Sequence, residues 1–380
     1  MRGHFKRRGE RWYFWAELEP AATGKRRQVS RGGFGTRKEA ETAFAALRDQ
    51  IRTGAYVEPV KATLGAYLVD EWLPAIRASV RPTTHDHYAR MVRAHVVPRL
   101  GDVRLQALNP PQLNAFYADL LLGGRRLRPG MPLAPKTVRH VHTMLHKALA
   151  DAVKWGRVSK NAADLAEPPR PATPEMKVWD TDQLRMFLEG VRDDRLFASW
   201  MLMVTTGMRR GEVLGFRWSD VNLDLARVSV VRTLVVVGHD VLISEPKTAK
   251  GRRSVALDPA TVAALRDHRR AQRKERVAFG EGRNDEQLVF ALEDGTRIHP
   301  TRFSAWFSQH SRRAGLPVIR LHDLRHSYAT AALSAGIPAK VVSERLGHAN
   351  VSITLDTYSH VLPSLQEDAA SAVAALILGT

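Results

Sequence analysis

The sequence predicts a mainly α-helical protein with small β elements, an α+β chain of several domains. Its 380 residues correspond to two or three domains at roughly 100–200 residues each. Hydrophobic residues make up 44% of the chain, which is enough for packed cores and excludes intrinsic disorder as the main state. Apolar residues at helical spacing dominate from residue 60 onward, whereas the alternating patterns typical of strands are short.

Residues 1–58 are predicted to form a small basic sheet followed by one helix. RWYFWAELE at 11–19 alternates with the period of a strand, and KRRQVSR at 25–31 follows as a second strand. Thr36 and Glu39 predict a capping box at the start of the helix. The aromatic strand has two interpretations, an ordinary core strand and a surface that contacts DNA, and both stay open.

Residues 59–164 are predicted to be a helical domain. Helical spacing marks one run that ends at Pro98, a second from Pro110 or Pro111 to Leu122, and a third around 138–152. The next segment, LAEPPRPATPEMKV at 165–178, has four prolines within seven positions, which predicts an extended linker. Two bodies joined by such a linker suit a clamp around a rod-like molecule.

Residues 179–362 are predicted to mix helices with a strand-rich insert, and residues 363–380 to form a tail helix. The tail SLQEDAASAVAALILGT has one apolar face, which either packs on its own domain or docks on a neighbouring protomer. The apolar face consists of Ala369, Ala370, Val373, Leu376 and Ile377. Helices are predicted near 182–190, 194–206, 209–216, 259–279, 300–314, 321–335, 338–347 and 350–359, and strands around 226–238, 241–245 and 253–257.

The net charge of +19 is concentrated in the first part of the chain. Residues 1–60 carry +6 and residues 61–170 carry +9, whereas residues 171–380 carry only +4. A polyanion is the partner that such a charge attracts, and nucleic acid is the commonest one. The asymmetry therefore predicts DNA binding by the N-terminal segments, with a merely solvated basic surface or an acidic membrane as weaker alternatives. Candidate DNA contacts in the basic strand and loops are Arg26, Arg27, Arg125, Arg126, Arg128, Lys136 and Lys250.

Composition also excludes several kinds of chemistry. The chain has no cysteine, so it has no disulfide framework, thiolate zinc site, iron–sulfur cluster or cysteine nucleophile. The N-terminus lacks the apolar core of a signal peptide, and no apolar run is long enough for a membrane span. We therefore expect a cytoplasmic protein with no membrane partner.

Four stretches between residues 206 and 360 together supply the parts needed to attack a phosphodiester. Two arginines, Arg209 and Arg325, can hold the non-bridging oxygens bidentately, and His322 lies one helical turn before Arg325. A tyrosine hydroxyl beside cations and imidazoles becomes a useful nucleophile, and a lysine can protonate the leaving 5′ oxygen. Taken singly, each residue has a structural explanation. The stretches are TGMRRGEVLGFRW (206–218), EPKTAKGRRSVAL (245–257), LHDLRHSYAT (321–330) and LGHANVSITLDTYSH (346–360).

The order and spelling of these stretches resemble the tyrosine recombinase (phage integrase) family. TGMRRGE matches the family's T-G-x-R-x-x-E signature, which implies Arg209 as the first catalytic arginine and Glu212 as its supporting residue. LHDLRHSYAT matches the H-x-x-R box, which implies His322 and Arg325. LGHANVSITLDTYSH matches the L-G-H box with the nucleophile after it, which implies His348 and Tyr358.

The family's proton-donating hairpin resembles PKTAKGRRSVAL in this chain. The spelling favours Lys247 as the general acid, while Lys250 lies three residues further on and Gly251 stands where a serine is frequent. Segment 1–58 resembles the three-stranded arm-type DNA-binding module of lambda-like integrases, which implies an N-terminal three-stranded sheet plus one helix. The helical segment, with Thr84, Tyr88 and PRLGDVRLQAL, resembles the family's core-binding (SAM-like) domain.

The resemblance implies a site-specific recombinase that integrates or excises a phage or other mobile element at the nucleoid of a bacterial cell. Tyr358 would form a 3′-phosphotyrosyl link, and strand exchange would pass through a Holliday junction within a homotetramer. Neither a metal nor another cofactor is needed. The implied partners are duplex DNA with core and arm sites, a directionality factor and a DNA-bending protein.

Other functions remain as alternatives. A type IB topoisomerase uses nearly the same side chains, and a non-catalytic DNA-binding protein explains the charge. A metal-dependent nuclease needs an acidic cluster, which the sequence lacks. The histidines could indicate a metal site, but no carboxylates stand at ligand spacing beside them. The histidines concerned are His322, His326, His348 and His360.

Overall fold

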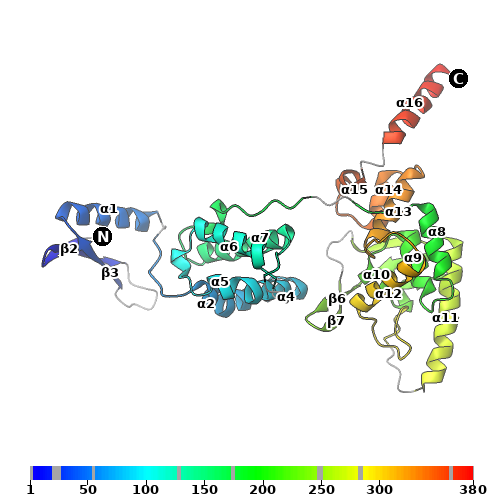
Figure 1. Ribbon diagram of the computed structural model, residues 1–380, viewed down its shortest axis with the longest axis horizontal. Coiled ribbons are helices and arrows are strands. Elements are labelled where there is room, and N and C mark those ends of the chain that lie inside the picture. The colour runs from blue at the N-terminus through cyan, green and yellow to red at the C-terminus, as the bar shows by residue number, and fades with distance from the viewer. Residues whose placement is uncertain are drawn as a thin grey trace. The chain divides into compact units, whose positions relative to one another are not determined.

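The computed structural model describes residues 3–18, 27–53, 56–125, 130–172, 176–245, 251–280, 286–358 and 363–379 (Figure 1). The chain divides into two compact units, residues 1–172 and 173–380, within the proline-rich segment 165–178. Helices predominate and the sheets are small, so the predicted fold class is confirmed. None of the described helices is long and apolar enough to cross a membrane.

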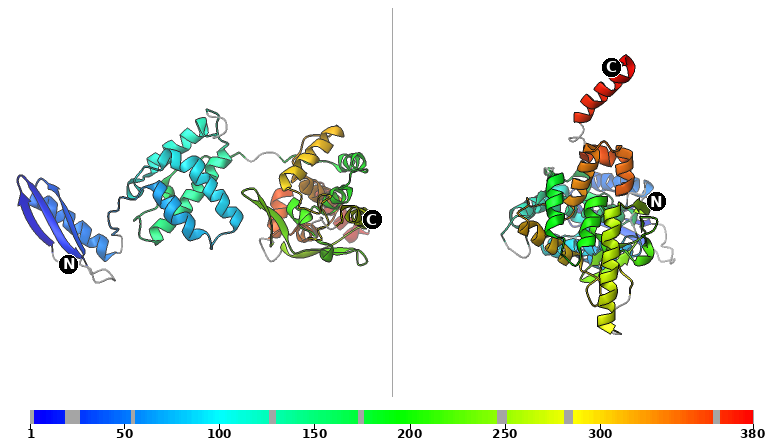
Figure 2. Two further views of the ribbon diagram at one scale, coloured as in Figure 1. Left: turned by 90° about the horizontal axis from the view of Figure 1, so that it is seen from below. Right: turned by 90° about the vertical axis from the view of Figure 1, so that its right-hand side faces the viewer.

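The N-terminal part is an antiparallel three-stranded sheet with α1 on one face (Figure 2). Phe14 and Ala16, two positions apart on β2, are fully buried, and Phe14 packs with Ala40 and Leu47 of the helix. The two strands predicted from the alternating pattern are present, and β1 completes the three-stranded sheet that the family resemblance implied. The elements are β1 (Gly3–Arg8), β2 (Arg11–Leu18), β3 (Arg27–Phe34) and α1 (Arg37–Arg52).

The start of α1 corrects one detail of the sequence prediction. The Thr36 side chain accepts a hydrogen bond from the backbone N–H of Glu39 at 3.2 Å, as a capping box requires. The Glu39 carboxylate, however, accepts from the N–H of Gly35 at 2.9 Å instead of that of Thr36. Only half of the predicted box is therefore formed.

The rest of the first unit is helical, as predicted. One element was missed, a continuous helical stretch over residues 64–76 that includes a π-helical segment at Tyr67–Trp72. Two polar groups of this stretch donate hydrogen bonds to α7 (Pro135–Lys154). The Tyr67 hydroxyl donates to the carbonyl of Ala148 at 2.8 Å, and the Trp72 indole N–H donates to Asp151 at 2.9 Å. The elements are α2 (Leu64–Ala66), α3 (Leu73–Ile76), α4 (Pro82–Met91), a π-helical segment (Val92–Val96), α5 (Val97–Leu100), 3-10 turns at Leu105–Ala107 and Ala162–Leu165, α6 (Pro110–Gly123) and α7 (Pro135–Lys154).

The second unit surrounds an aromatic core with helices and a strand-rich insert. Trp200 stacks on Phe303 with ring centroids 4.2 Å apart, and Trp179, Phe187 and Phe307 pack around them. The helices are α8 (Thr181–Gly190), α9 (Phe197–Thr206), α10 (Arg210–Leu214), a 3-10 turn (Trp218–Asp220), α11 (Pro259–Phe279), α12 (Pro300–Arg313), α13 (Asp323–Ser334), α14 (Ala339–Leu346), α15 (Val351–Tyr358) and the tail helix α16 (Pro363–Leu378).

The insert differs from the prediction of one long strand over 226–238. The chain leaves one sheet after Val230 and enters another at Thr233, and between them Arg232 forms an ion pair with Asp220. Strand β5 (Arg227–Val230) therefore pairs with β4 (Val221–Asn222) and β8 (Arg253–Ala256), whereas β6 (Thr233–Val237) pairs with β7 (Asp240–Ser244). Strand β4 was not predicted.

Candidate active site

A glycine turn at the end of α9 brings the two predicted arginines together. Gly207 has a φ of 65°, in the left-handed region, so the chain turns sharply before Arg209, which is the N-cap residue of α10. A Cβ at Gly207 would lie 2.5 Å from the ring of Tyr328, so α13 packs directly on this turn. The Gly207 carbonyl accepts a hydrogen bond from Arg325 at 3.0 Å across 118 positions of sequence.

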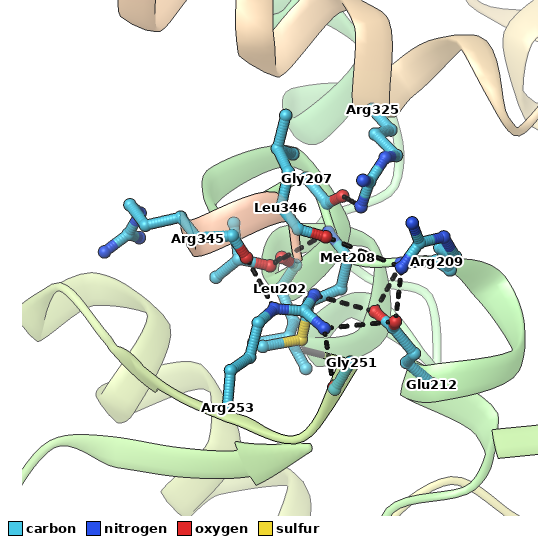
Figure 3. Close-up of polar contacts among 11 residues, drawn as sticks. Leu202, Gly207, Met208, Arg209, Glu212, Gly251, Arg253, Arg325, Arg345 and Leu346 are labelled. Atoms are coloured by element: carbon cyan, nitrogen blue, oxygen red, sulfur yellow. Dashed lines mark hydrogen bonds and ion pairs between the residues drawn. The ribbon is translucent and has the colours of Figure 1, made fainter. Parts of the chain in front are cut away.

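The buried carboxylate of Glu212 lies beneath Arg209 and accepts hydrogen bonds from two arginines (Figure 3). Glu212 accepts from the Arg209 guanidinium at 2.9 Å and from its backbone N–H at 3.0 Å. Arg253, on β8, donates to both Glu212 oxygens at 3.1 and 2.9 Å. Burial by itself would raise the pKa of Glu212, but the hydrogen bonds and charge of Arg253, with the charge of Arg209, leave that pKa lowered. Glu212 is therefore ionised and fixes Arg209 in place.

Arg253 also belongs to this cluster, although it was not predicted from the sequence. Its Nε donates to the carbonyl of Arg345 at 2.6 Å, which attaches β8 to the end of α14. Gly347 follows with a φ of 70°, and a Cβ there would lie 2.9 Å from the Arg253 guanidinium. The close approach of Arg253 to Gly347 therefore sets the position of the turn that carries His348.

Arg325 is buried, with one terminal nitrogen on the Gly207 carbonyl and the other without a hydrogen-bond partner in the described part of the chain. Burial, followed by the charge of Arg209, lowers the pKa of Arg325 to about 9. A guanidinium group in this state gains most from an anion that accepts from its remaining N–H groups. Arg209 and Arg325 together can bind such an anion.

Two predicted histidines lie beside these arginines and are neutral near pH 7. His322 keeps an exposed surface, but partial desolvation of its ring, together with His326, Arg325 and Arg209, lowers its pKa to about 4. Burial, followed by the charges of Arg325 and Arg209, likewise lowers the pKa of His348 to about 4. The Nδ1 of His348 is hydrogen-bonded to the hydroxyl of Thr354 at 2.8 Å, which fixes the orientation of its ring.

Tyr358, at the end of α15, is buried with only 1% of its surface exposed. Its hydroxyl is 2.7 Å from Nδ1 of His326, which lies one turn after His322 on α13. Burial raises the pKa of Tyr358 to about 12, although the charge of Arg325 acts in the opposite direction. From sequence, His326 was considered only as a metal ligand, although its i+4 spacing from His322 was a signal for a place in this site.

A groove of about 1040 Å³ opens beside these groups. Its lining is strongly basic, and the carboxylate of Asp323 in its wall is paired with Arg320 at 2.7 Å. No group of three or more His, Asp or Glu side chains within the described ranges is arranged to hold a metal ion. The charged and titratable residues of the lining include Lys177, Arg209, Arg210, Arg320, His322 and His326.

Of the remaining predicted site residues, some lie within the described residues and the others lie outside them. Arg27 is bonded to Glu58, with Nε 2.7 Å from the carboxylate, whereas Arg125 and Lys136 are exposed. The other predictions lie outside the described residues, namely Arg26, Arg126, Arg128, Lys247 and Lys250.

Comparisons with known families cover most of the chain. Residues 178–364 match the phage integrase family, residues 4–51 an arm DNA-binding domain, and residues 66–121 the N-terminal SAM-like domain of phage integrases. A XerC-like tyrosine recombinase of Caldanaerobacter subterraneus subsp. tengcongensis is 29% identical, and the match covers 88% of each chain. The ICEBs1 integrase of Bacillus subtilis is 24% identical over 88% of this chain and 89% of its own.

Solved structures share the fold. The Tn1549 transposon integrase in complex with a circular intermediate DNA has a TM-score of 0.65 and 19% identity, with coverage of 78% of this chain and 95% of its own. The lambda integrase dimer bound to a COC′ core site has a TM-score of 0.60 and 15% identity, with coverage of 93% and 94%. A lambda integrase tetramer bound to a Holliday junction has a TM-score of 0.58 and 16% identity, with coverage of 93% and 96%.

Proposed function

This chain belongs to the phage integrase family of tyrosine recombinases, and from that membership we propose that it cuts and rejoins duplex DNA at specific sites through a 3′-phosphotyrosyl intermediate. One structural observation supports this proposal for particular residues of the chain. Arg325 is buried with an unpartnered terminal nitrogen beside Arg209, and the hydroxyl of Tyr358 lies in the same cluster. A phosphodiester matches both the charge and the hydrogen-bonding capacity of this arrangement.

The proposed chemistry assigns one role to each predicted residue. Arg209 and Arg325 bind the non-bridging oxygens of the scissile phosphate and stabilise their growing negative charge. The Tyr358 oxygen attacks phosphorus, the bond from phosphorus to the 5′ oxygen breaks, and Lys247 protonates that oxygen. His322 and His348 stand beside the arginines and hydrogen-bond the same phosphate. Ligation is the reverse reaction, in which a 5′-hydroxyl displaces the tyrosine.

The division of labour follows the segments defined by sequence. Residues 1–58 bind arm sites, and residues 59–164 and 179–362 bind the core site on either side of the linker 165–178. The active form is a homotetramer that passes through a Holliday junction to move a phage or other mobile element. A directionality factor and a DNA-bending protein assist it at the nucleoid, in the cytoplasm of a bacterial cell.

The decisive experiment measures covalent protein–DNA adducts on a nicked suicide substrate that contains the core site. Tyr358→Phe is expected to bind this DNA normally and to form no adduct. Tyr117→Phe is the matched control, because Tyr117 is also buried with its hydroxyl on a histidine nitrogen, 2.9 Å from His142. An adduct at wild-type level with Tyr358→Phe would refute the assignment.

The same assay separates this function from a metal-dependent nuclease. Excess EDTA is expected to leave adduct formation unchanged, because the two arginines supply the positive charge that a metal would otherwise provide. Activity lost in EDTA and restored by Mg²⁺ would support the nuclease instead.

A further inference from the structure

We propose that His326 accepts the proton of the Tyr358 hydroxyl during cleavage and returns it during ligation. This inference rests on the proposed function and adds a catalytic residue to it. His326 follows the H-x-x-R box directly, and neither charge nor motif spacing assigned it to the reaction.

Three contacts carry the proposal. Nδ1 of His326 lies 2.7 Å from the Tyr358 hydroxyl, within the range of a direct proton transfer. The ring of His322 stands edge-on to that of His326, with centroids 5.2 Å apart and planes at 89°, and so restrains its orientation. The corresponding nitrogen of His348, Nδ1, already has a different partner, the hydroxyl of Thr354.

The surroundings of His326 suit a proton acceptor. To accept through Nδ1, the ring must be neutral and carry its proton on Nε2. Burial lowers the pKa of His326, Asp323 raises it, and Arg325 and Arg320 lower it further, so the neutral form prevails at neutral pH. The groups that face His326 are His322, Asp323, Arg325 and Arg320 from α13 and the preceding segment, His348 from the turn between α14 and α15, and Tyr358 from α15.

The proton balance of the step is complete. The O–H bond of Tyr358 breaks as its oxygen bonds to phosphorus, and the proton moves to Nδ1 of His326. The phosphorus bond to the 5′ oxygen breaks, and that oxygen takes a separate proton from the general acid. In ligation the 5′-hydroxyl loses its proton to the general acid, and His326 returns its own to the tyrosine oxygen.

The hydrogen bond between His326 and Tyr358 has an alternative, inhibitory role, in which it acts as a lock that holds the tyrosine hydroxyl away from the DNA. Two variants distinguish the roles. His326→Ala removes the acceptor, whereas His326→Asn places an amide oxygen near the position of Nδ1 that can accept the hydrogen bond but cannot take the proton. His142→Asn is the matched control, because it alters the buried pair with Tyr117 in the first unit.

The measurement is the single-turnover rate of adduct formation on the suicide substrate as a function of pH, with core-site binding as the check on folding. Both His326 variants are expected to bind DNA and to react about 10²–10⁴-fold more slowly, the range typical of a lost acid–base group. They are also expected to lose the fall in rate that wild type shows when His326 is protonated.

Any other pattern overturns the proposal. A rate at or above wild type in either variant would indicate a structural hydrogen bond or a lock. A slow variant that keeps the wild-type pH profile would indicate a positional role. Absence of any adduct in wild type would instead refute the proposed function itself.

Discussion

Arg253 and Glu212 form a bidentate ion pair in which both side chains are buried, with 7% and 5% of their surfaces exposed. The pair joins β8 to the start of α10, so it connects the strand-rich insert to the segment that presents Arg209. Removal of one partner of a buried ion pair is far more destabilising than loss of an exposed pair, because the other charge stays buried without compensation.

The first prediction concerns stability. Arg253→Ala should lower the free energy of unfolding of the second unit by about 3 kcal/mol, at the lower end for a broken buried pair because Arg209 still contacts Glu212. Arg252→Ala, which removes an exposed pair with Glu245, should change it by less than about 1 kcal/mol. Urea unfolding followed by tryptophan fluorescence measures both. Equal effects of the two variants would contradict the buried pair.

The pair of Glu212 and Arg253 also determines the direction in which the free energy of unfolding changes in acid. The pKa of Glu212 is lowered from its ordinary value of 4.5, so its stabilising effect is present above pH 4.5 and is lost as the pH falls through the lower folded pKa. Glu212→Gln removes this titration, so its unfolding free energy should depend less on pH below 4.5 than that of wild type.

The sequence predicted most of the helices and strands whose signals are local. The helices with strong apolar spacing and the second and third strands of the N-terminal sheet were found because their signals lie within a few residues. The long strand at 226–238 was wrong because the ion pair of Arg232 with Asp220 separates two sheets. That contact depends on tertiary folding, and the alternating pattern of the segment does not contain it.

The residues of the site that sequence missed have the same explanation. Arg253 follows Arg252 in a basic turn, and only the folded position of Glu212, 41 positions away, distinguishes the two arginines. His326 was visible in the sequence, but its role depends on the packing of α15 against α13, which places Tyr358 on Nδ1. Motif spelling therefore predicted the residues expected to contact phosphate and the supporting Glu212, whereas the places of Arg253 and His326 required the structure.

The second prediction concerns His322 and His348. Their folded pKa values of about 4 lie below the ordinary 6.5, so the free energy of unfolding should decrease as the pH falls from 6.5 towards 4. A bound phosphate adds negative charge beside them and should raise both pKa values. Histidine NMR titration of Tyr358→Phe, free and with core-site DNA, measures the change. Unchanged titration with bound DNA would place the phosphate elsewhere.

The third prediction concerns α16. Leu376, Ile377 and Leu378 are 86%, 76% and 72% exposed, so the tail helix presents an apolar surface. An apolar surface of this kind is typical of a protein–protein contact, and the docking surface of a neighbouring protomer is the expected partner. Leu376→Asp with Ile377→Asp should reduce tetramer formation on DNA more than monomer binding, whereas Ser371→Ala on the same helix should change neither. Equal losses of both activities would contradict docking between protomers.

The fourth prediction separates the two lysines of the hairpin. The 5′ oxygen leaves as a strongly basic alkoxide and needs a proton, whereas a thiolate leaves readily because thiols have a pKa near 8.5. Lys247→Ala should therefore slow adduct formation on ordinary DNA by about 10²–10⁴ and recover most of its rate on a substrate with sulfur at the 5′ bridging position.

Lys250→Ala serves as the matched variant for this test, because its charge is expected to contact the DNA backbone only. Its rate should change little at low salt, and the dependence of log affinity on log salt should decrease by about one unit, the effect of one lost phosphate contact. Sulfur cannot rescue such a variant, since no proton transfer was lost. If the sulfur substrate instead rescues Lys250→Ala and leaves Lys247→Ala slow, Lys250 is the general acid and the match of PKTAKGRRSVAL to the family hairpin is displaced by three residues.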